Sequence, residues 1–243
     1  MLAVIMAGGE GTRLRPYTQV IPKPLLPVGE KPILEIVINQ LKNEGFGDFI
    51  ITTGYQGDLI KAYFQDGSKL GVSIEYTTEE TRMGTAGALS LIERRVTAPF
   101  LIMNGDILTD LSLKRFMESH AAEGAILTVG VVRYKLNIPY GVIKSNGNIF
   151  ESIEEKPQFF FDVGAGIYGA SSEIFGYIAR GRGMDFPELI RILKRGGKKI
   201  RCFEIEEFWK DIGIMEDFQE VNREIGTWSH KRLYHVFTEA EQA

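Results

Sequence analysis

Apolar residues in the first 110 positions alternate between short continuous runs and helical spacing. Leu2–Ala7, Asp48–Gly54 and Pro99–Met103 are largely apolar runs, which is typical of strands buried on both faces. Lys31–Glu44 instead spaces its apolar residues as one face of a helix, and Gly45 follows where a helix commonly ends. These segments predict three buried strands and a helix.

The other segments of this half continue the alternation. We expect helices at Asp58–Gln65 and Thr85–Arg94 and a strand at Val72–Tyr76. Strands that alternate with helices predict a parallel sheet covered on both faces. In open sheets of this kind, ligands bind beyond the carboxyl ends of the strands. The segments after Ala7, Gly54, Tyr76 and Met103 are therefore candidate ligand-binding segments.

After residue 110 the pattern becomes richer in strands. The helices expected there are Leu111–Ala122, Ser171–Ile178, Asp185–Lys194 and Met215–Ile225. The strands expected there are Ala125–Arg133, Tyr140–Ser145, Asn148–Glu155, Asp162–Tyr168 and Ile200–Ile205. The whole pattern predicts an α/β protein, a three-layer α/β/α Rossmann-like fold. Its sheet would be mixed and mainly parallel, with a small β-rich lobe.

Composition limits the classes of function. The 243 residues carry 28 Lys and Arg against 32 Asp and Glu, a net charge of −4, so a broad nucleic-acid-binding face is not expected. We also expect a cytoplasmic protein without a membrane partner, because no leader or long apolar run is visible. Cys202 is the single cysteine and is expected to be half-buried, and His120 is expected to be exposed. A homo-oligomer remains open.

The first predicted strand leads directly into a glycine-rich loop, Gly8-Gly9-Glu10-Gly11-Thr12-Arg13. Glycines allow backbone N–H groups to approach an anion. The loop lacks the lysine of a Walker motif, and Leu14 stands where a dinucleotide fingerprint needs its third glycine. Lys23 follows between two prolines, which hold its backbone extended. The loop with Arg13 and Lys23 predicts a phosphate-binding site.

Together these motifs resemble the signature of the sugar-1-phosphate nucleotidyltransferases. Further segments resemble other motifs of that family and occur in the family's order over about residues 2–225. They are Gly84–Leu89, Asn104–Asp106, Tyr140–Val142, Glu154–Pro157, Gly164–Tyr168 and Trp209–Gly213. The resemblance implies one catalytic domain over 1–225, with a nucleotide-binding half (1–110) and a sugar-binding half (111–225). A tail that could be helical would occupy 226–243.

The reaction implied by the resemblance joins a nucleoside triphosphate and a sugar-1-phosphate, giving a nucleotide sugar and pyrophosphate. A phosphate monoester is largely dianionic near pH 7, so its oxygen can attack the α-phosphorus without a general base. The motifs are most similar to the mannose-, heptose- and hexosamine-1-phosphate guanylyltransferases, which favours GTP. Thymidylyl, uridylyl, cytidylyl and adenylyl transfer stay open.

The resemblance also implies roles for individual residues. Arg13 and Lys23 would be catalytic, and Asp106 and Asp211 would hold Mg²⁺. The residues expected to bind the nucleotide are Met6, Ala7, Gly8, Gly9, Gly11, Thr12, Arg13, Glu79, Gly84 and Thr85, with Glu80 as a further candidate. The residues expected to bind the sugar phosphate are Gly141, Glu155, Lys156 and Gly164. Family members commonly have asparagine at the position of Gly164, which leaves the sugar open.

Simpler interpretations exist for several of these residues. Asp106 and Asp211 could be turn or capping residues, and Glu154–Lys156 could be a solvated run of charges. We interpret Phe159–Phe161 as lobe packing or a subunit contact rather than a ligand-stacking site. A nucleotide-sugar-sensing subunit without activity is an alternative function. A glycosyltransferase would need a D-x-D motif, and a molybdopterin nucleotidyltransferase would lack the Glu-Lys-Pro segment.

Overall fold

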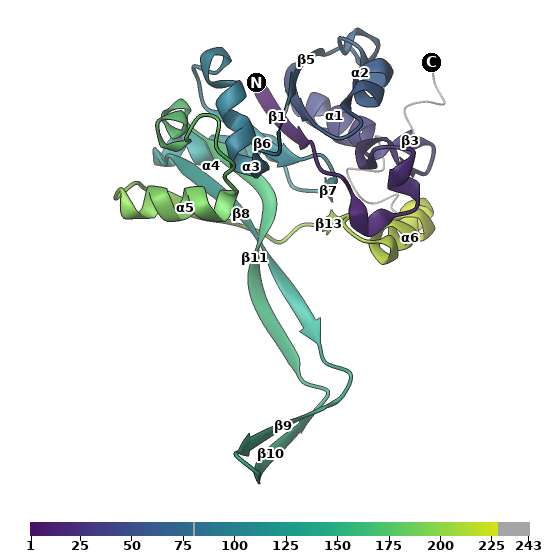
Figure 1. Ribbon diagram of the computed structural model, residues 1–243, viewed down its shortest axis with the longest axis vertical. Helices are drawn as coiled ribbons and strands as arrows, with labels where there is room; N and C mark the ends of the chain where they lie inside the picture. The colour runs from purple at the N-terminus through teal and green to yellow at the C-terminus, as the bar shows by residue number, and fades with distance from the viewer. Residues whose placement is uncertain (80, 228–243) are drawn as a thin grey trace.

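The computed structural model describes residues 1–79 and 81–227. Glu80 and residues 228–243, which include most of the expected tail, lie outside this part of the chain. A seven-stranded sheet forms the centre of the molecule (Figure 1). In spatial order its strands are β12 (Ile200–Ile205), β8 (Leu127–Asn137), β11 (Gln158–Ala170), β6 (Phe100–Asn104), β1 (Leu2–Ala7), β4 (Asp48–Thr53) and β5 (Ser73–Thr78).

The sheet is mixed, as expected from the sequence. Strands β6, β1, β4 and β5 are parallel to their neighbours within this group, and β12 is parallel to β8. Strand β11 alone is antiparallel to the strands on both of its sides. The carboxyl ends of β1, β4 and β6 therefore meet at one edge, where the glycine-rich loop begins.

Helices cover both faces of the sheet because the side chains of its central strands alternate. In β1, Ala3 and Ile5 pack in the core beneath α1 (Ile33–Asn43), α2 (Gly57–Phe64) and α4 (Leu113–Glu123). Val4 points the other way, into the core beneath α3 (Gly84–Gly87), α5 (Phe186–Arg195) and their flanking turns. The three-layer arrangement predicted from the apolar pattern is confirmed.

Two expected helices are shorter or tighter than predicted. The segment expected as one helix over Thr85–Arg94 contains α3, followed by the 3₁₀ turns η5 (Ala88–Leu91) and η6 (Glu93–Arg95). The segment expected as a helix over Ser171–Ile178 is a 3₁₀ helix, η7 (Ser172–Tyr177). The last described helix is α6 (Met215–Glu224), and η8 (Ile225–Thr227) follows it.

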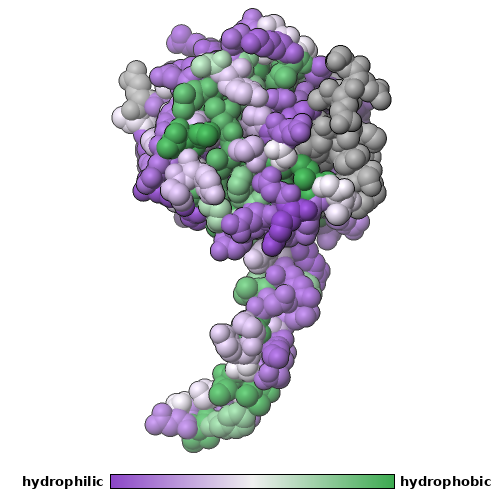
Figure 2. Space-filling model, turned by 90° about the vertical axis from the view of Figure 1, so that its right-hand side faces the viewer, coloured by the Kyte–Doolittle hydropathy of each residue, from purple (hydrophilic) through white to green (hydrophobic). Residues whose placement is uncertain are grey.

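The β-rich part of the second half takes the form of a long two-stranded arm. Strands β8 and β11 stay paired beyond the sheet, out to the pair Asn137 and Gln158. A hairpin of β9 (Gly141–Asn146) and β10 (Ile149–Glu155) forms the tip. Figures 1 and 2 show the arm extending far from the rest of the molecule. We use "the arm" for residues 134–161.

Two small sheets were not expected from the sequence. One pairs β7 (Ile107–Thr109) with β13 (Trp209–Asp211), and the other pairs β2 (Pro27–Val28) with β3 (Lys31–Pro32). Each has strands of only two or three residues, which are too short to produce a periodic apolar pattern. The first of them positions two candidate site residues.

Two expectations about exposure are wrong. His120 is 2% exposed, because α4 packs against Gly169 of β11, and its Nδ1 lies 2.8 Å from the hydroxyl of Thr128. Cys202 is exposed, because it lies on β12 at the edge of the sheet. Within the described residues, no helix has the length and apolar character needed to cross a bilayer.

Candidate active site

The glycine-rich loop begins where β1 passes close to the end of β4. A Cβ atom on Gly54 would lie 2.8 Å from the carbonyl oxygen of Gly8. A Cβ atom on Gly8 would lie 2.8 Å from Oε1 of Glu79. Both distances are too short for real atoms, so glycine at these two positions allows the strand ends and the Glu79 carboxylate to approach one another.

A hydrogen bond from Thr18 holds the turn that follows, at Gly11. Gly11 has a φ of +60°, and the hydroxyl of the buried Thr18 donates a hydrogen bond of 2.8 Å to its carbonyl oxygen. Within the described chain, no hydrogen bond engages the backbone N–H groups of Gly9, Glu10 or Gly11. Backbone donors held open in such a turn are suited to an anion.

Four charged side chains from distant segments meet beside this loop. The Lys23 ammonium forms an ion pair with Asp106 and lies 3.9 Å from Oδ1 of Asp211. The Arg13 guanidinium also lies near Asp211, since a Cβ atom on Gly213 would be 3.3 Å from Nη2 of Arg13 and 3.2 Å from Oδ1 of Asp211. The structure thus brings together the two predicted cations and the two predicted metal ligands.

The small sheet of β7 and β13 brings Asp106 and Asp211 together. Asp211 pairs with Ile107, and the N–H of Ile212 donates to the carbonyl oxygen of Asp106 at 3.0 Å. On the same strand, the indole N–H of Trp209 donates to the carbonyl oxygen of Ala165 at 2.9 Å. Backbone pairing therefore holds two carboxylates close together that are 105 residues apart in the sequence.

The two carboxylates have the character of ligands for a hard cation. Oδ1 of Asp106 and Oδ1 of Asp211 are both buried and have no hydrogen-bond partner among the described residues. A buried oxygen without a partner is costly, and a bound cation would satisfy it. No group of three or more metal-ligating side chains occurs in this part of the chain, but Mg²⁺ is commonly held by one or two carboxylates together with substrate phosphates.

Asp211 should make stability depend on pH. Burial, and then the Asp106 carboxylate, raise the pKa of Asp211 to about 6, against about 3.9 in an unfolded chain. Between these values the folded protein binds more protons, so this contribution to stability is present at low pH and is lost as pH rises toward 6. In EDTA, we expect the unfolding free energy of the wild type to fall relative to Asp211→Asn as pH rises from 4 to 6.

Urea denaturation of both proteins across this range would measure the difference. Asp217→Asn is a suitable control, because Asp217 is a weaker influence on Asp211 and is held by Lys210 at 2.8 Å. Parallel pH curves for the wild type and Asp211→Asn would contradict the raised pKa.

Glu79, Gly84 and Thr85 form the opposite end of the site. Oε2 of Glu79 accepts a hydrogen bond of 2.8 Å from the N–H of Met83, while its other oxygen lies beside Gly8. Gly84 has a φ of +72°, and a Cβ atom there would lie 2.6 Å from the Met184 carbonyl oxygen. The base-side residues expected from the sequence are therefore packed against a segment from the second half of the chain.

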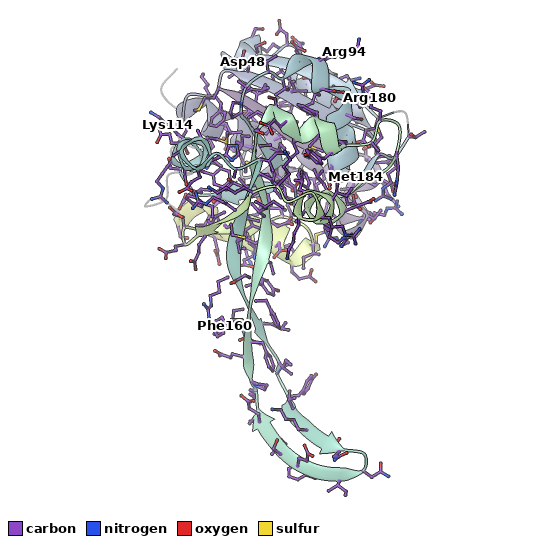
Figure 3. The ribbon with its side chains drawn as sticks, turned by 90° about the vertical axis from the view of Figure 1, so that its left-hand side faces the viewer. Asp48, Arg94, Lys114, Phe160, Arg180 and Met184 are labelled. Carbon is purple, nitrogen blue, oxygen red and sulfur yellow. The ribbon has the colours of Figure 1, made fainter. Side chains whose placement is uncertain are left out.

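That segment, Gly183–Asp185, was missed by sequence reasoning. Oδ1 of Asp185 accepts from the N–H of Thr85 at 3.2 Å, and the Thr85 hydroxyl accepts from the N–H of Phe186 at 3.3 Å. The sequence offered one signal, an aspartate at the start of a predicted helix. Its side chain does not cap that helix but accepts the hydrogen bond from Thr85. Met184 is labelled on the body in Figure 3.

A cleft of about 710 Å³ joins these groups. Its lining includes the predicted residues Met6, Ala7, Gly8, Gly9, Gly11, Thr12, Arg13, Lys23, Glu79, Gly84, Thr85 and Asp106. It also includes residues that the sequence analysis did not assign, namely Glu10, Pro24, Arg82, Gly183, Met184, Asp185 and Glu188. Asp211 is not part of this lining, but its Oδ1 atom lies 3.9 Å from the ammonium of Lys23, which lines the cleft.

The four predicted sugar-side residues are absent from the lining of this cleft. Gly141, Glu155 and Lys156 lie at the tip of the arm, where Gly141 is paired with Glu155. Gly164 lies on β11 opposite Val131, at the base of the arm. A Cβ atom on Gly164 would meet nothing within 4 Å, so packing does not require glycine there.

Known proteins resemble this chain over most of its length. The model of the nucleotidyl transferase family matches residues 2–227. The chain is 32% identical to a UTP–glucose-1-phosphate uridylyltransferase of a Synechocystis species, over 92% of this chain and 63% of that protein. It is also 32% identical to a mannose-1-phosphate guanylyltransferase of Mycobacterium tuberculosis, over 89% of this chain and 62% of that protein.

Among solved structures, a Bacillus anthracis protein assigned as a glucose-1-phosphate thymidylyltransferase superposes with a TM-score of 0.74. It is 28% identical, and the match covers 92% of this chain and 94% of that one. The chain thus spans a little under two thirds of the two enzymes compared by sequence, and nearly all of the chain compared by structure. By its motifs, its fold and the extent of the family match, the chain belongs to the nucleotidyl transferase family.

Proposed function

We propose that the protein transfers a nucleotidyl group from a nucleoside triphosphate, with GTP favoured, to a sugar-1-phosphate. The products are a nucleotide sugar and pyrophosphate. The observation that carries the proposal is the meeting of Arg13, Lys23, Asp106 and Asp211 beside an open glycine-rich turn. Two cations and two carboxylates at a loop of free N–H groups suit a reaction between polyanions.

Positioning and charge neutralisation account for most of the catalysis in this reaction class. The amides of the glycine-rich loop bind the triphosphate, and Arg13 stabilises the charge that develops on the departing pyrophosphate. Lys23 lies between the α-phosphate and the sugar phosphate and offsets their repulsion. Asp106 and Asp211 hold Mg²⁺, which neutralises phosphate charge when bound.

The arrangement around Glu79 supports guanine as the base. Its Oε1 atom lies beside Gly8, while Oε2 accepts a hydrogen bond from the N–H of Met83. Guanine presents two adjacent N–H donors on its Watson–Crick edge, which a carboxylate can accept together. Uracil and thymine present one N–H between two carbonyl oxygens, which a carboxylate repels. Uridylyl, thymidylyl and cytidylyl transfer remain the alternatives.

We expect Glu79→Gln to lower kcat/KM for GTP by about tenfold or more, because a hydrogen bond to a charged group is lost. Its effect with UTP or dTTP should be smaller, since the repulsion is also lost. Glu75→Gln is the matched control, because Glu75 lies on β5 just before Glu79 and is paired with Arg95 at the surface. Equal losses with all three nucleotides would remove Glu79 from base recognition.

Pyrophosphate release is the direct test of the proposal. The full chain would be assayed with GTP, UTP, dTTP, CTP and ATP against a panel of sugar-1-phosphates, with Mg²⁺ and with EDTA. We expect release with at least one pair, highest with GTP and abolished by EDTA. Absence of release with every pair, together with tight binding of a finished nucleotide sugar, would favour a sensing subunit instead.

A further inference from the structure

The arm exposes an unusual amount of apolar surface. Of the 18 large hydrophobic side chains that are exposed in the described chain, ten lie between Tyr134 and Phe161. Tyr140 and Ile149 are each 73% exposed. A two-stranded hairpin is only marginally stable in water, and large exposed apolar patches mark interaction surfaces. The arm therefore has the character of a segment that is covered in the working protein.

Part of this surface forms an ordered stripe. Tyr134 is paired with Phe161, and Leu136 is paired with Phe159. Because side chains alternate along a strand, these two cross-strand pairs share one face. We call these four residues the apolar stripe. Phe160 points to the opposite face, where the guanidinium of Arg133 lies 5.2 Å from its ring centre; Figure 3 labels it partway along the arm.

A second exposed apolar surface lies beside the cleft. Tyr17, Val20 and Ile21 are 54%, 73% and 41% exposed. They follow the glycine-rich loop and precede Lys23, and Thr18 between them is bonded to Gly11. An apolar segment that packed here would lie at the phosphate end of the cleft.

The arm tip carries predicted sugar-side residues, and the cleft of the same chain has none of them in its lining. The tip of the arm carries Gly141, Glu155 and Lys156, and a Cβ atom on Gly141 would lie 3.0 Å from a Glu155 carboxylate oxygen. None of these residues lines the cleft of the same chain, and the arm extends away from the body (Figures 1 and 2). Fourteen residues per strand reach about 45 Å, which is enough to cross to a second body.

We propose that two copies of this chain exchange arms. The apolar stripe of one copy packs against the Tyr17–Ile21 segment of the other, and the arm tip supplies the sugar side of the partner's cleft. Every copy has both an arm and an open cleft, so a two-fold arrangement satisfies both sets of surfaces at once. The role assigned to the arm tip rests on the proposed function, whereas the exchange of arms does not.

Complementation between variants tests where the arm acts. Lys156→Ala disables the arm tip, and Lys23→Ala disables the cleft. Each homodimer should be nearly inactive, but a heterodimer isolated with two affinity tags contains one intact cleft beside one intact arm. We expect about half of the wild-type rate per dimer, because one of two equivalent sites is restored. A heterodimer of Lys23→Ala with Asp106→Asn has defects in both clefts and should stay inactive.

An inactive heterodimer of Lys156→Ala and Lys23→Ala, formed from folded chains, would show that the arm bends back onto its own cleft and would overturn the proposal. Lys144→Ala, which removes a charge from β9 of the same tip, is the matched control for the loss of Lys156.

Sedimentation velocity tests the exchange independently of activity. We expect a dimer for the wild type and a monomer with an unchanged circular dichroism spectrum for the double variant Tyr134→Ser/Phe161→Ser. Val20→Ser should weaken the dimer from the other side of the contact. A monomeric wild type at micromolar concentration would overturn the proposal. That result would also be expected if a different protein, and not a second copy of this chain, covered the arm. A dimer without activity on any substrate would refute only the proposed function.

Discussion

Asp106→Asn should lower kcat for pyrophosphate release by about 10²–10³, the cost of removing one preorganised charged group from a reaction between polyanions. The substitution keeps the size of the side chain but removes half of the carboxylate pair beside Lys23. The substitution removes repulsion from the neighbouring Asp211 but also removes the ion pair with Lys23, so the stability of the metal-free variant should stay within about 1 kcal/mol of the wild type.

Steady-state rates and thermal melting with and without Mg²⁺ would test both parts. The wild type should gain stability from Mg²⁺ plus nucleotide, and the variant should gain less. Asp110→Asn, beyond the short strand β7, is a control outside the carboxylate pair. A variant with full activity, or one with an undiminished response to Mg²⁺, would contradict the metal-ligand role of Asp106.

Lys23→Ala should lower kcat by about a hundredfold or more while changing KM for the nucleotide by less than about threefold. The Lys23 side chain is 12% exposed and its ammonium is fixed by Asp106, so it is held in advance where we propose that the two reacting phosphates meet. Its interaction grows when the attacking and receiving phosphates approach, and an interaction that grows in the transition state appears in kcat.

Initial rates at varied nucleotide and saturating sugar-1-phosphate would separate the two constants. Arg15→Ala is a matched control, because Arg15 is also a cation near the loop but is 53% exposed and 3.9 Å from the Glu10 carboxylate. We expect it to change kcat by less than about threefold, in keeping with the small energies of exposed ion pairs. A loss confined to KM in Lys23→Ala would contradict its placement between the phosphates.

The apolar pattern predicted the fold wherever burial was periodic and the element was long. Leu2–Ala7 is a strand with the predicted ends, and the helix expected over Lys31–Glu44 forms as Ile33–Asn43. The pattern failed where pairing with a distant strand, rather than the local apolar periodicity, decides where an element ends. The arm extends β8 and β11 by four residues each beyond the expected ends, because cross-strand pairing continues there without a core.

The candidate site could be predicted only as separate motifs. The glycine-rich loop and Lys23 are close in sequence, and their chemistry is readable from residue type alone. The meeting of Asp106 with Asp211 depends on the pairing of β7 with β13, which has no local signal. Asp185 was missed for the same reason, because its partner Thr85 lies 100 residues away.

The pairing of β7 with β13 also has a consequence for the order in which the protein is made. The glycine-rich loop and Lys23 leave the ribosome early, but Asp106 lacks its partner carboxylate until residue 211 has emerged. A nascent chain can therefore build its phosphate-binding turn long before it can build a two-carboxylate cation site. All seven strands of the central sheet are synthesised before Asp211.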